Sequence, residues 1–301
     1  MSEKVITSYK AFNKNMQCRN FQYEVGKEYE MDGEIKYCNR GFHACKSPLE
    51  VWDYYDMLNS RFAEVEQTGK IDEEEKSTKV CSSHIKIKAE LKLADIINIG
   101  VEWLKDITSP SKVKTDGELN DNGDRRKQIG SSGDYAMIGS SGYSAKIGSS
   151  GDYAKIGSSG DYAMIGSSGD SAKIGSSGYS AKIGSSGDDA QIGSSGDYAQ
   201  IGSSGDYAQI GSSGYPAKIG SSGDYAQIDS TGEDSVIMCA GRNSRAKAKV
   251  GSWITLAEWV WNDDKERYVP KCVKTDYVDG ERIKADTWYQ LKNGEFVEVT
   301  E

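Results

Sequence analysis

Hydrophobic and polar positions repeat with a nine-residue period through the middle of this chain. Thirteen copies of a unit that reads Ile-Gly-Ser-Ser-Gly-Asp-Tyr-Ala-Lys run without a break from residue 129 to residue 245. In an extended backbone, successive side chains point to opposite faces. The alanine, the isoleucine and the first serine of a unit therefore share one face, whereas the tyrosine, the lysine and the first glycine share the other.

The remaining residues of each unit, the second serine, the second glycine and the aspartate, are typical of turns. We expect the glycine to supply a left-handed conformation, and the serine or aspartate to hydrogen-bond its own backbone. Each unit thus predicts one short strand followed by one corner.

Stacked units place their isoleucines in ladders, from Ile129 to Ile228, around a thin core of isoleucine and alanine. Tyrosine replaces the aspartate at Tyr143, Tyr179 and Tyr215, which are 36 residues apart. With two units per coil these tyrosines lie on one corner, whereas three units per coil would scatter them. The pattern favours a parallel β-solenoid (β-helix or β-roll) over residues 129–250 with about 18 residues per coil, and an antiparallel meander is the alternative.

The pattern before the repeats is that of an ordinary globular domain. We expect a compact α+β head over residues 1–106, with three strands and one helix that begins with Ser and Pro. Residues 107–128 are rich in polar and turn residues, and are either a connector or a degenerate first coil. The expected strands are residues 5–12, 21–25 and 83–89, and the expected helix is 47–55.

The pattern changes again at residues 251–301. The run 253–261 is apolar on both faces, as expected for a strand that covers the end of a solenoid. Two later strand-like runs are residues 268–273 and 288–291. The dipeptides Asp279-Gly280 and Asn293-Gly294 are strong hairpin signals that would join such strands. We expect a C-terminal β-hairpin cap, because an uncapped solenoid exposes a bare strand edge.

Composition narrows the classes of function. The 301 residues carry a net charge of −9, which argues against a nucleic-acid or anionic-membrane surface. No apolar run reaches the length of a membrane helix, and residues 1–4 do not begin a signal peptide. The six cysteines are too sparse for a disulfide scaffold. We expect a cytoplasmic protein with no membrane contact.

Two histidines, His43 and His84, limit the catalytic chemistry. Cys45 lies just before the expected helix, where a helix N-terminus lowers a thiol pKa, so a nucleophilic Cys45 with His84 as its base is one hypothesis. A buried cysteine and a packed histidine are the interpretation that we favour. The spacings of Cys38, His43 and Cys45 match no standard zinc motif. We therefore expect neither a metal nor a cofactor.

The segment 41–55 resembles a part of ADP-ribosyltransferase-like folds in which a Gly-aromatic strand leads through a serine into an aromatic-rich helix. The resemblance implies that His43 or Tyr55 lies near a nicotinamide pocket and that Glu64 or Glu66 is the catalytic acid. It covers about fifteen residues and lacks a partner His or Arg in the first strand, so it implies a shared fold more than an activity. The candidate catalytic residues are His43, Cys45, Glu66 and His84.

Nearly the whole chain resembles uncharacterised proteins of gut bacteria, their phages and prophages, in which a domain of unknown function precedes Gly-Asp-Tyr-Ala repeats. The segments that carry the resemblance are 9–12, 18–27, 38–45 and 251–254. The resemblance implies a role in phage–host conflict or in a virion, and brings no established activity.

The outward tyrosines of the repeats are candidate binding residues for a protein partner or a glycan. The alternative is that tyrosine is simply a good strand former on a solvated face. Nine Asp against five Lys between residues 129 and 227 give too weak a charge to mimic nucleic acid. We expect a binding or scaffold protein, with homo-oligomerisation left open, and an enzyme in the head as the alternative. The candidate residues are Tyr135, Tyr153, Tyr162, Tyr198, Tyr207 and Tyr225.

Overall fold

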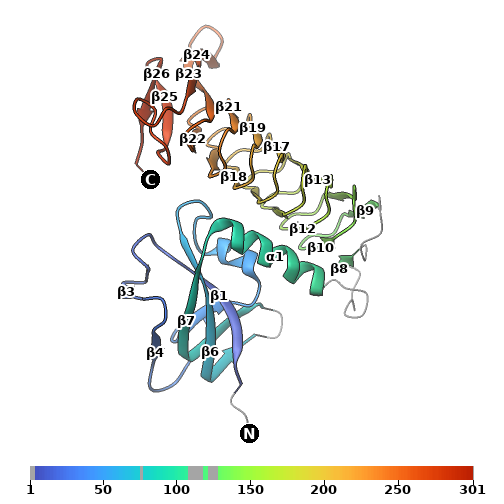
Figure 1. Cartoon of the computed structure of the whole chain (residues 1–301), viewed down its shortest axis with the longest axis vertical. Helices are drawn as coiled ribbons and strands as arrows, with labels where there is room; N and C mark the ends of the chain where they lie inside the picture. The colour runs from blue at the N-terminus through green and yellow to red at the C-terminus, as the bar shows by residue number, and fades with distance from the viewer. Residues whose placement is uncertain (1–3, 75–76, 108–117, 121–127, 301) are drawn as a thin grey trace. The chain divides into compact units, whose positions relative to one another are not determined.

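The computed structural model describes residues 4–74, 77–107, 118–120 and 128–300, with only the backbone described at 118–120. It divides into two compact units, Met1–Trp103 and Leu104–Glu301. Figure 1 shows both units. We call the first unit the head.

The head is built on one antiparallel sheet with the strand order β4-β7-β5-β1-β6. β6 also pairs with β7, so four of the strands close into a small barrel around Phe12, Phe42, Val65 and Ile87. A short pair, β2 (Gln17–Cys18) and β3 (Phe21–Gln22), lies outside this sheet. The five strands are β1 (Ile6–Phe12), β4 (Glu28–Glu30), β5 (Phe42–Cys45), β6 (Arg61–Glu73) and β7 (Lys79–Leu91).

Helical structure in the head differs from the expectation. Residues 47–55 contain only a 3₁₀ helix, η1 (Pro48–Asp53), and the Ser47 side chain makes no capping hydrogen bond. A longer helix, α1 (Leu93–Ile107), was not predicted, although the spacing of its buried Ile96, Ile97 and Val101 is helical. The fold class nevertheless is the expected α+β head followed by an all-β solenoid.

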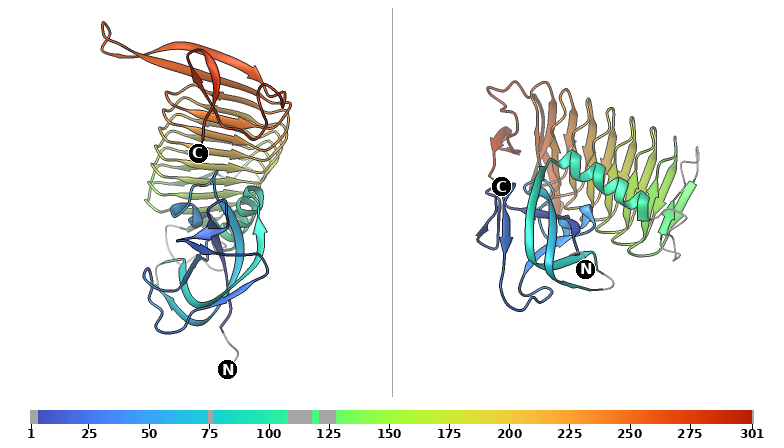
Figure 2. Two further views of the ribbon diagram at one scale, coloured as in Figure 1. Left: turned by 90° about the vertical axis from the view of Figure 1, so that its left-hand side faces the viewer. Right: turned by 60° about the horizontal axis from the view of Figure 1, so that its bottom comes forward.

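The repeats form two parallel sheets, and successive strands alternate between them (Figure 2). We call them the odd and the even sheet. The odd sheet contains β9 (Gln128–Ser131), β11 (Lys146–Ser149), β13 (Met164–Ser167), β15 (Lys182–Ser185), β17 (Gln200–Ser203), β19 (Lys218–Ser221) and β21 (Val236–Cys239). The even sheet contains β8 (Glu118–Asn120), β10 (Met137–Ser140), β12 (Lys155–Ser158), β14 (Lys173–Ser176), β16 (Gln191–Ser194), β18 (Gln209–Ser212), β20 (Gln227–Ser230) and β22 (Arg245–Ala248).

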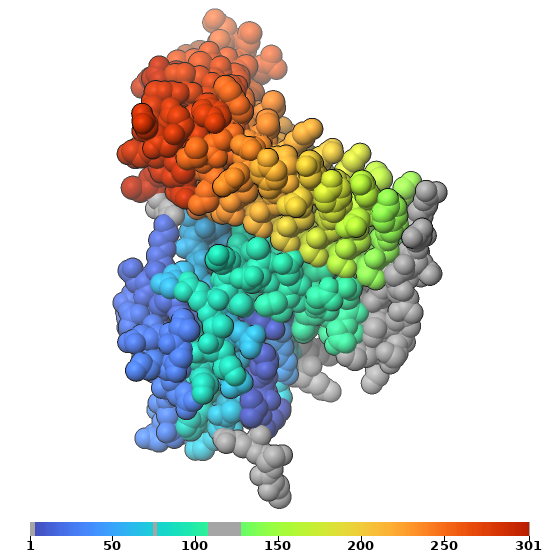
Figure 3. All heavy atoms as spheres, in the orientation of Figure 1, coloured from blue at the N-terminus to red at the C-terminus, as the bar shows by residue number. Residues whose placement is uncertain are grey.

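Each coil holds two nonapeptides. Paired residues are 18 positions apart, as in Ile156 with Ile174, and every pairing between the repeats is parallel, which excludes the meander. Ala154 and Ile156 are fully buried, so the expected inward face is confirmed. β8 joins the even sheet through β10, so this part of the 107–128 segment belongs to the solenoid. In the space-filling view, neighbouring coils touch, and their colours follow one another in chain order (Figure 3).

The left-handed residue of the corner is not the glycine that we expected. It is the tyrosine position: Tyr153 has a φ of 57° and Tyr162 the same value. A left-handed non-glycine residue is unfavourable on its own. Here its N–H donates to a carbonyl of the next coil, from Tyr153 to Asp170 at 2.8 Å, so stacking stabilises the conformation.

The corner glycine is required by close packing instead. A Cβ added to Gly169 would lie 2.1 Å from the carbonyl oxygen of Gly151, and one added to Gly187 would lie 2.1 Å from that of Gly169. Only a residue without a side chain fits where successive coils approach this closely.

The corner aspartates tie neighbouring coils together, whereas we expected them to bond within their own turn. The N–H of Asp152 donates to Oδ1 of Asp134 at 3.0 Å, and that of Asp170 to Asp152 at 2.9 Å. Some strand serines bond locally: the Oγ atoms of Ser131, Ser140 and Ser158 each accept the N–H of the glycine two residues on, at 3.3 Å. The buried Oγ atoms of Ser149 and Ser167, by contrast, have no hydrogen-bond partner among the described residues.

A four-strand cap closes the C-terminal end (Figure 2). β23 (Trp253–Asn262) extends the odd sheet and pairs with β24 (Arg267–Tyr277), and β25 (Tyr289–Lys292) extends the even sheet and pairs with β26 (Glu295–Glu298). Asn293-Gly294 forms the expected hairpin turn, with positive φ at both residues.

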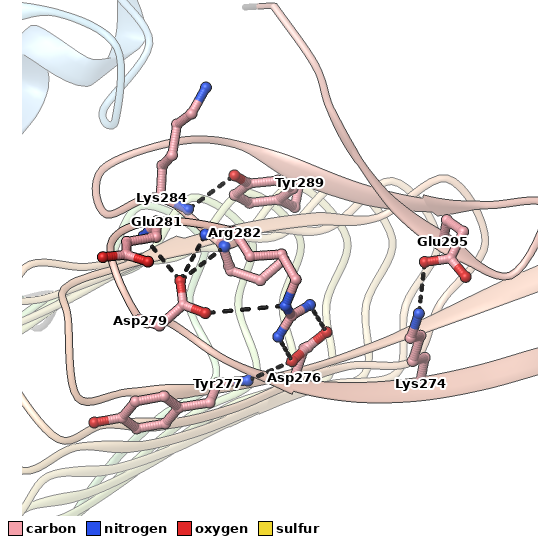
Figure 4. Close-up of polar contacts among 10 residues, drawn as sticks. Lys274, Asp276, Tyr277, Asp279, Glu281, Arg282, Lys284, Tyr289 and Glu295 are labelled. Atoms are coloured by element: carbon pink, nitrogen blue, oxygen red, sulfur yellow. Dashed lines mark hydrogen bonds and ion pairs between the residues drawn. The ribbon is translucent and has the colours of Figure 1, made fainter.

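Asp279-Gly280 is not a hairpin, so this expectation was wrong. It begins the loop that joins β24 to β25, where the Asp279 carboxylate accepts the N–H groups of Glu281, Arg282 and Ile283 (Figure 4). Arg282 also pairs with Asp276, at the end of β24. The loop is therefore held by side-chain oxygens where strand pairing is absent.

The two faces of a solenoid strand predict opposite responses to charge. Ile183 is buried and Lys182 beside it is exposed. We expect Ile183→Asp to destabilise the protein by more than about 3 kcal/mol, because it buries a carboxylate without a partner. Lys182→Glu should change stability by less than about 0.5 kcal/mol. Thermal denaturation of both variants measures this, and equal melting temperatures would refute the assignment of the faces.

Candidate functional site

The head contains a cavity of about 550 Å³. β1 and β5 supply one side, and the segments around β2, β3 and η1, the segment between β4 and β5, and the start of β7 supply the rest. The lining residues are Tyr9, Lys10, Ala11, Cys18, Arg19, Phe21, Tyr23, Met31, Cys38, Asn39, Arg40, Gly41, Phe42, His43, Ala44, Cys45, Val51, Tyr54, Tyr55 and Lys79.

The charge of this lining is one-sided. Four cationic residues, Lys10, Arg19, Arg40 and Lys79, line the cavity, and no Asp or Glu is among its described lining residues. The guanidinium of Arg40 donates to the backbone carbonyl oxygens of Glu34 and Asp32, at 2.9 and 2.6 Å. Within the described residues none of the four forms an ion pair with a carboxylate. This excess of positive charge contrasts with the net charge of −9 of the chain.

Lys10 is the most deeply placed of these cations, with only 6% of its surface exposed. Its Nζ donates to the carbonyl oxygen of His43 at 2.8 Å and lies 3.6 Å from Sγ of Cys18. Burial lowers the pKa of this ammonium. The rings of Phe12 and Tyr23 lie 5.6 and 5.5 Å from Nζ, within the range of a cation–π contact.

Lys79 enters the cavity from the start of β7. Its Nζ lies 4.5 Å from the centre of the Tyr54 ring and 3.4 Å from Sγ of Cys38. Neutral groups thus hold both lysines, and an anion in the cavity would meet their uncompensated charge.

His43 lies on β5, and its buried Nε2 has no hydrogen-bond partner in the described part of the chain. Burial, followed by the positive charges of Lys79, Lys10 and Arg19, lowers the pKa of His43 to about 4. The imidazole is therefore neutral at pH 7, with one ring nitrogen available to a ligand.

A protein-family model described as "Domain of unknown function (DUF7666)" matches residues 6–99. The head is a DUF7666 domain. Neither a search of curated proteins nor a search of solved structures found a match to the chain. Among the described helices, none has the length and apolar character needed to cross a membrane.

Cys45 lines the cavity of the DUF7666 domain but is not an activated thiol. Burial, followed by the charges of Glu50 and Asp53, raises its pKa to about 12. This is the opposite of the expected shift. The element after Cys45 is a 3₁₀ helix of six residues in place of the expected helix. Only 4% of the Cys45 surface is exposed to solvent.

The other two catalytic candidates lie away from this cavity. His84 is on β7, and its Nε2 is 3.3 Å from Oε1 of Glu30. Glu66 is on β6 and forms an ion pair with Lys88 at 2.6 Å. The structure therefore does not join Cys45 to His84, and it places no candidate acid beside His43. The described residues also hold no group of three or more His, Cys, Asp or Glu able to bind a metal.

The six candidate tyrosines of the solenoid lie in two rows. Tyr135, Tyr153, Tyr207 and Tyr225 occupy the corners that follow odd strands, and two ring pairs stack there at 5.0 Å. We call the second row, on the corners that precede odd strands, the tyrosine ladder. It contains Tyr162 and Tyr198 from the predicted set together with Tyr143, Tyr179 and Tyr215, with ring centres 5.1 to 5.8 Å apart between Tyr143 and Tyr198.

Sequence reasoning did not single out the outer face of the odd sheet. A shallow groove follows this face, along a row of glycines that we call the glycine strip. Beside it runs a row of exposed side chains, Gln128, Lys146, Met164, Lys182, Gln200, Lys218 and Val236. The strip consists of Gly130, Gly148, Gly166, Gly184, Gly202 and Gly220.

Alkylation separates a buried structural thiol from a reactive one at Cys45. With a pKa of about 12 against the usual 9.0, its thiolate fraction at pH 8 is about a thousandfold smaller. We expect iodoacetamide to label exposed Cys38 in the native protein and to leave Cys45 unlabelled, as measured by peptide mass spectrometry. Labelling of Cys45 ahead of Cys38 would restore the nucleophile hypothesis. The denatured chain, in which both should react, is the control.

Proposed function

We propose that this protein is a binding or scaffold protein whose solenoid presents a repetitive surface to a protein partner. The observation that carries the proposal is the glycine strip, which no feature of the fold requires. We further propose that it acts in the cytoplasm, of the host cell if it is phage-encoded, in the phage–host conflict that the family resemblance implies.

The strip glycines differ from the corner glycines in what surrounds them. A Cβ added to Gly148, Gly166 or Gly184 would meet nothing within 4 Å, and none of these residues has a positive φ. The row also tolerates a side chain at its end, where Met238 stands in register with Gly220.

Glycine inside a strand is unfavourable by roughly 0.5–1 kcal/mol relative to alanine. A row of such residues without a structural reason is typical of a surface that another backbone approaches closely. The strip therefore supports a role in binding.

The dimensions of this face indicate how much surface a partner needs. Seven strands at about 4.8 Å spacing and four residues of about 3.3 Å each give a face of roughly 29 by 13 Å, or about 400 Å². A stable interface buries about 800 Å² on each partner. The tyrosine ladder, which borders this face through Tyr162 and Tyr198, supplies the additional area.

Charge indicates the chemistry of the partner. Lys146, Lys182 and Lys218 stand on alternate strands of the odd sheet, in the exposed row beside the glycine strip. No acidic side chain lines the groove. We propose a protein with a flat surface that presents acidic side chains to these lysines.

The alternative, an enzyme in the DUF7666 domain, finds less support. The cavity has no lining carboxylate, its thiol Cys45 has a raised pKa, and His84 and Glu66 lie elsewhere. An enzyme that uses these residues as acid, base and nucleophile needs them within hydrogen-bond reach of one another.

Filling the glycine strip tests the proposed function. The unmodified full chain is compared with a Gly166→Val/Gly184→Val/Gly202→Val variant. Lys265→Val, which adds a valine in the cap away from the strip, is the control. Partners captured by the unmodified chain are purified and their affinities measured for each variant. We expect the triple variant to melt no lower than the unmodified chain, because valine favours strands, and to bind at least tenfold more weakly. If the triple variant binds the purified partner with the same affinity as the unmodified chain, the proposal is overturned.

A further inference from the structure

We propose that the cavity of the DUF7666 domain binds a small aromatic molecule that carries a phosphate group. This inference is independent of the solenoid, and it rests on the size, the charge and the aromatic walls of the cavity.

The size of the cavity fits a ligand rather than a packing defect. Its volume of about 550 Å³ falls in the range of small-molecule sites, which run from roughly 300 to 1,000 Å³. Such sites combine apolar and aromatic walls with a few convergent polar groups, as this one does.

The positive charges of the cavity favour the binding of an anion. Two lysines and two arginines line it without a carboxylate, and Lys10 is almost fully buried while held only by a carbonyl, a thiol and aromatic rings. A buried cation without a counter-ion is unfavourable, so a bound anion would stabilise the domain. Lys10, Arg19 and Lys79 suit a phosphate, which offers more oxygens and charge than a carboxylate. Arg40 adds positive charge to the same lining, although its guanidinium also donates to the backbone carbonyls of Asp32 and Glu34.

The aromatic residues provide a place for a ring. Phe21 is 42% exposed although it packs edge-on against Tyr23 and Phe42, at centre distances of 4.8 and 6.1 Å. Tyr54 and Tyr55 line the cavity from the segment after η1. Aromatic side chains that remain open to a cavity can stack on a planar ligand.

His43 supplies a polar contact between these regions. Its buried Nε2 lacks a partner among the residues that the structure describes, and a buried polar atom of this kind is normally hydrogen-bonded. Because the imidazole is neutral, it does not add a fifth positive charge, and it can give or accept one hydrogen bond with the ligand.

Calorimetric titration of the full chain with AMP, adenosine and inorganic phosphate tests the proposal. AMP carries both the ring and the phosphate, and we expect it to bind with a dissociation constant of about 10 µM. Adenosine and phosphate, each lacking one group, should bind at least tenfold more weakly. Absence of AMP binding, or equal affinity for adenosine and AMP, would overturn the assignment.

Variants then locate the site. Lys79→Gln and Arg19→Gln should each weaken AMP binding about tenfold, because each removes a charged contact. Lys86→Gln, on the same strand as Lys79 but paired with Glu28 outside the cavity, should leave the affinity unchanged. Melting temperatures confirm that the variants are folded. If folded Lys79→Gln and Arg19→Gln bind AMP like the unmodified chain, the cavity is not the binding site.

Discussion

The stacking of one coil directly on the next, in a register of 18 residues, is the constraint on which the solenoid depends. It pairs each strand with its equivalent in the following coil, places isoleucine on isoleucine, and brings corner backbones so close that only glycine fits between them. The same contact stabilises the left-handed tyrosine position, whose N–H reaches the next coil. Pro216 is an exception to this pattern. It occupies that position without an N–H, and the adjacent bond from Tyr198 to Tyr215 lengthens to 3.4 Å.

Stacking also separates two kinds of glycine that look alike in the sequence. Gly187 is fixed by the backbone of the coil beneath it, whereas Gly184 on the strand faces open space. The first kind is part of the fold, and the second is open to selection for a surface property. The DUF7666 domain shows a related contrast: Cys45 is a buried thiol, whereas a buried ring nitrogen of the nearby His43 has no partner among the described residues.

The period of isoleucine and the 36-residue spacing of Tyr143, Tyr179 and Tyr215 were sufficient to predict a solenoid with two units per coil. They could not reveal which residue turns the corner, because that choice depends on a hydrogen bond 17 residues away, such as Tyr153 to Asp170. Likewise, His43 and Cys45 were found as neighbours in sequence. The cavity that they line needs Arg19, Tyr54 and Lys79 from distant segments, which no local pattern joins. Helix α1 was missed although its apolar spacing is visible in the sequence. Gly100 in its middle has a low helix propensity, and the close approach to Leu49 that accommodates it is a contact between distant segments.

The most direct test of this account compares two alanine substitutions three residues apart in the same coil. Gly187→Ala places a Cβ 2.1 Å from the Gly169 carbonyl oxygen, and should destabilise the protein by about 1–3 kcal/mol. Gly184→Ala meets nothing within 4 Å and should leave stability unchanged or raise it by roughly 0.5–1 kcal/mol. Thermal denaturation of both variants beside the unmodified chain gives the answer. If Gly184→Ala destabilises the protein as much as Gly187→Ala, the strip glycines are required by the fold, and the distinction between the two kinds of glycine is wrong.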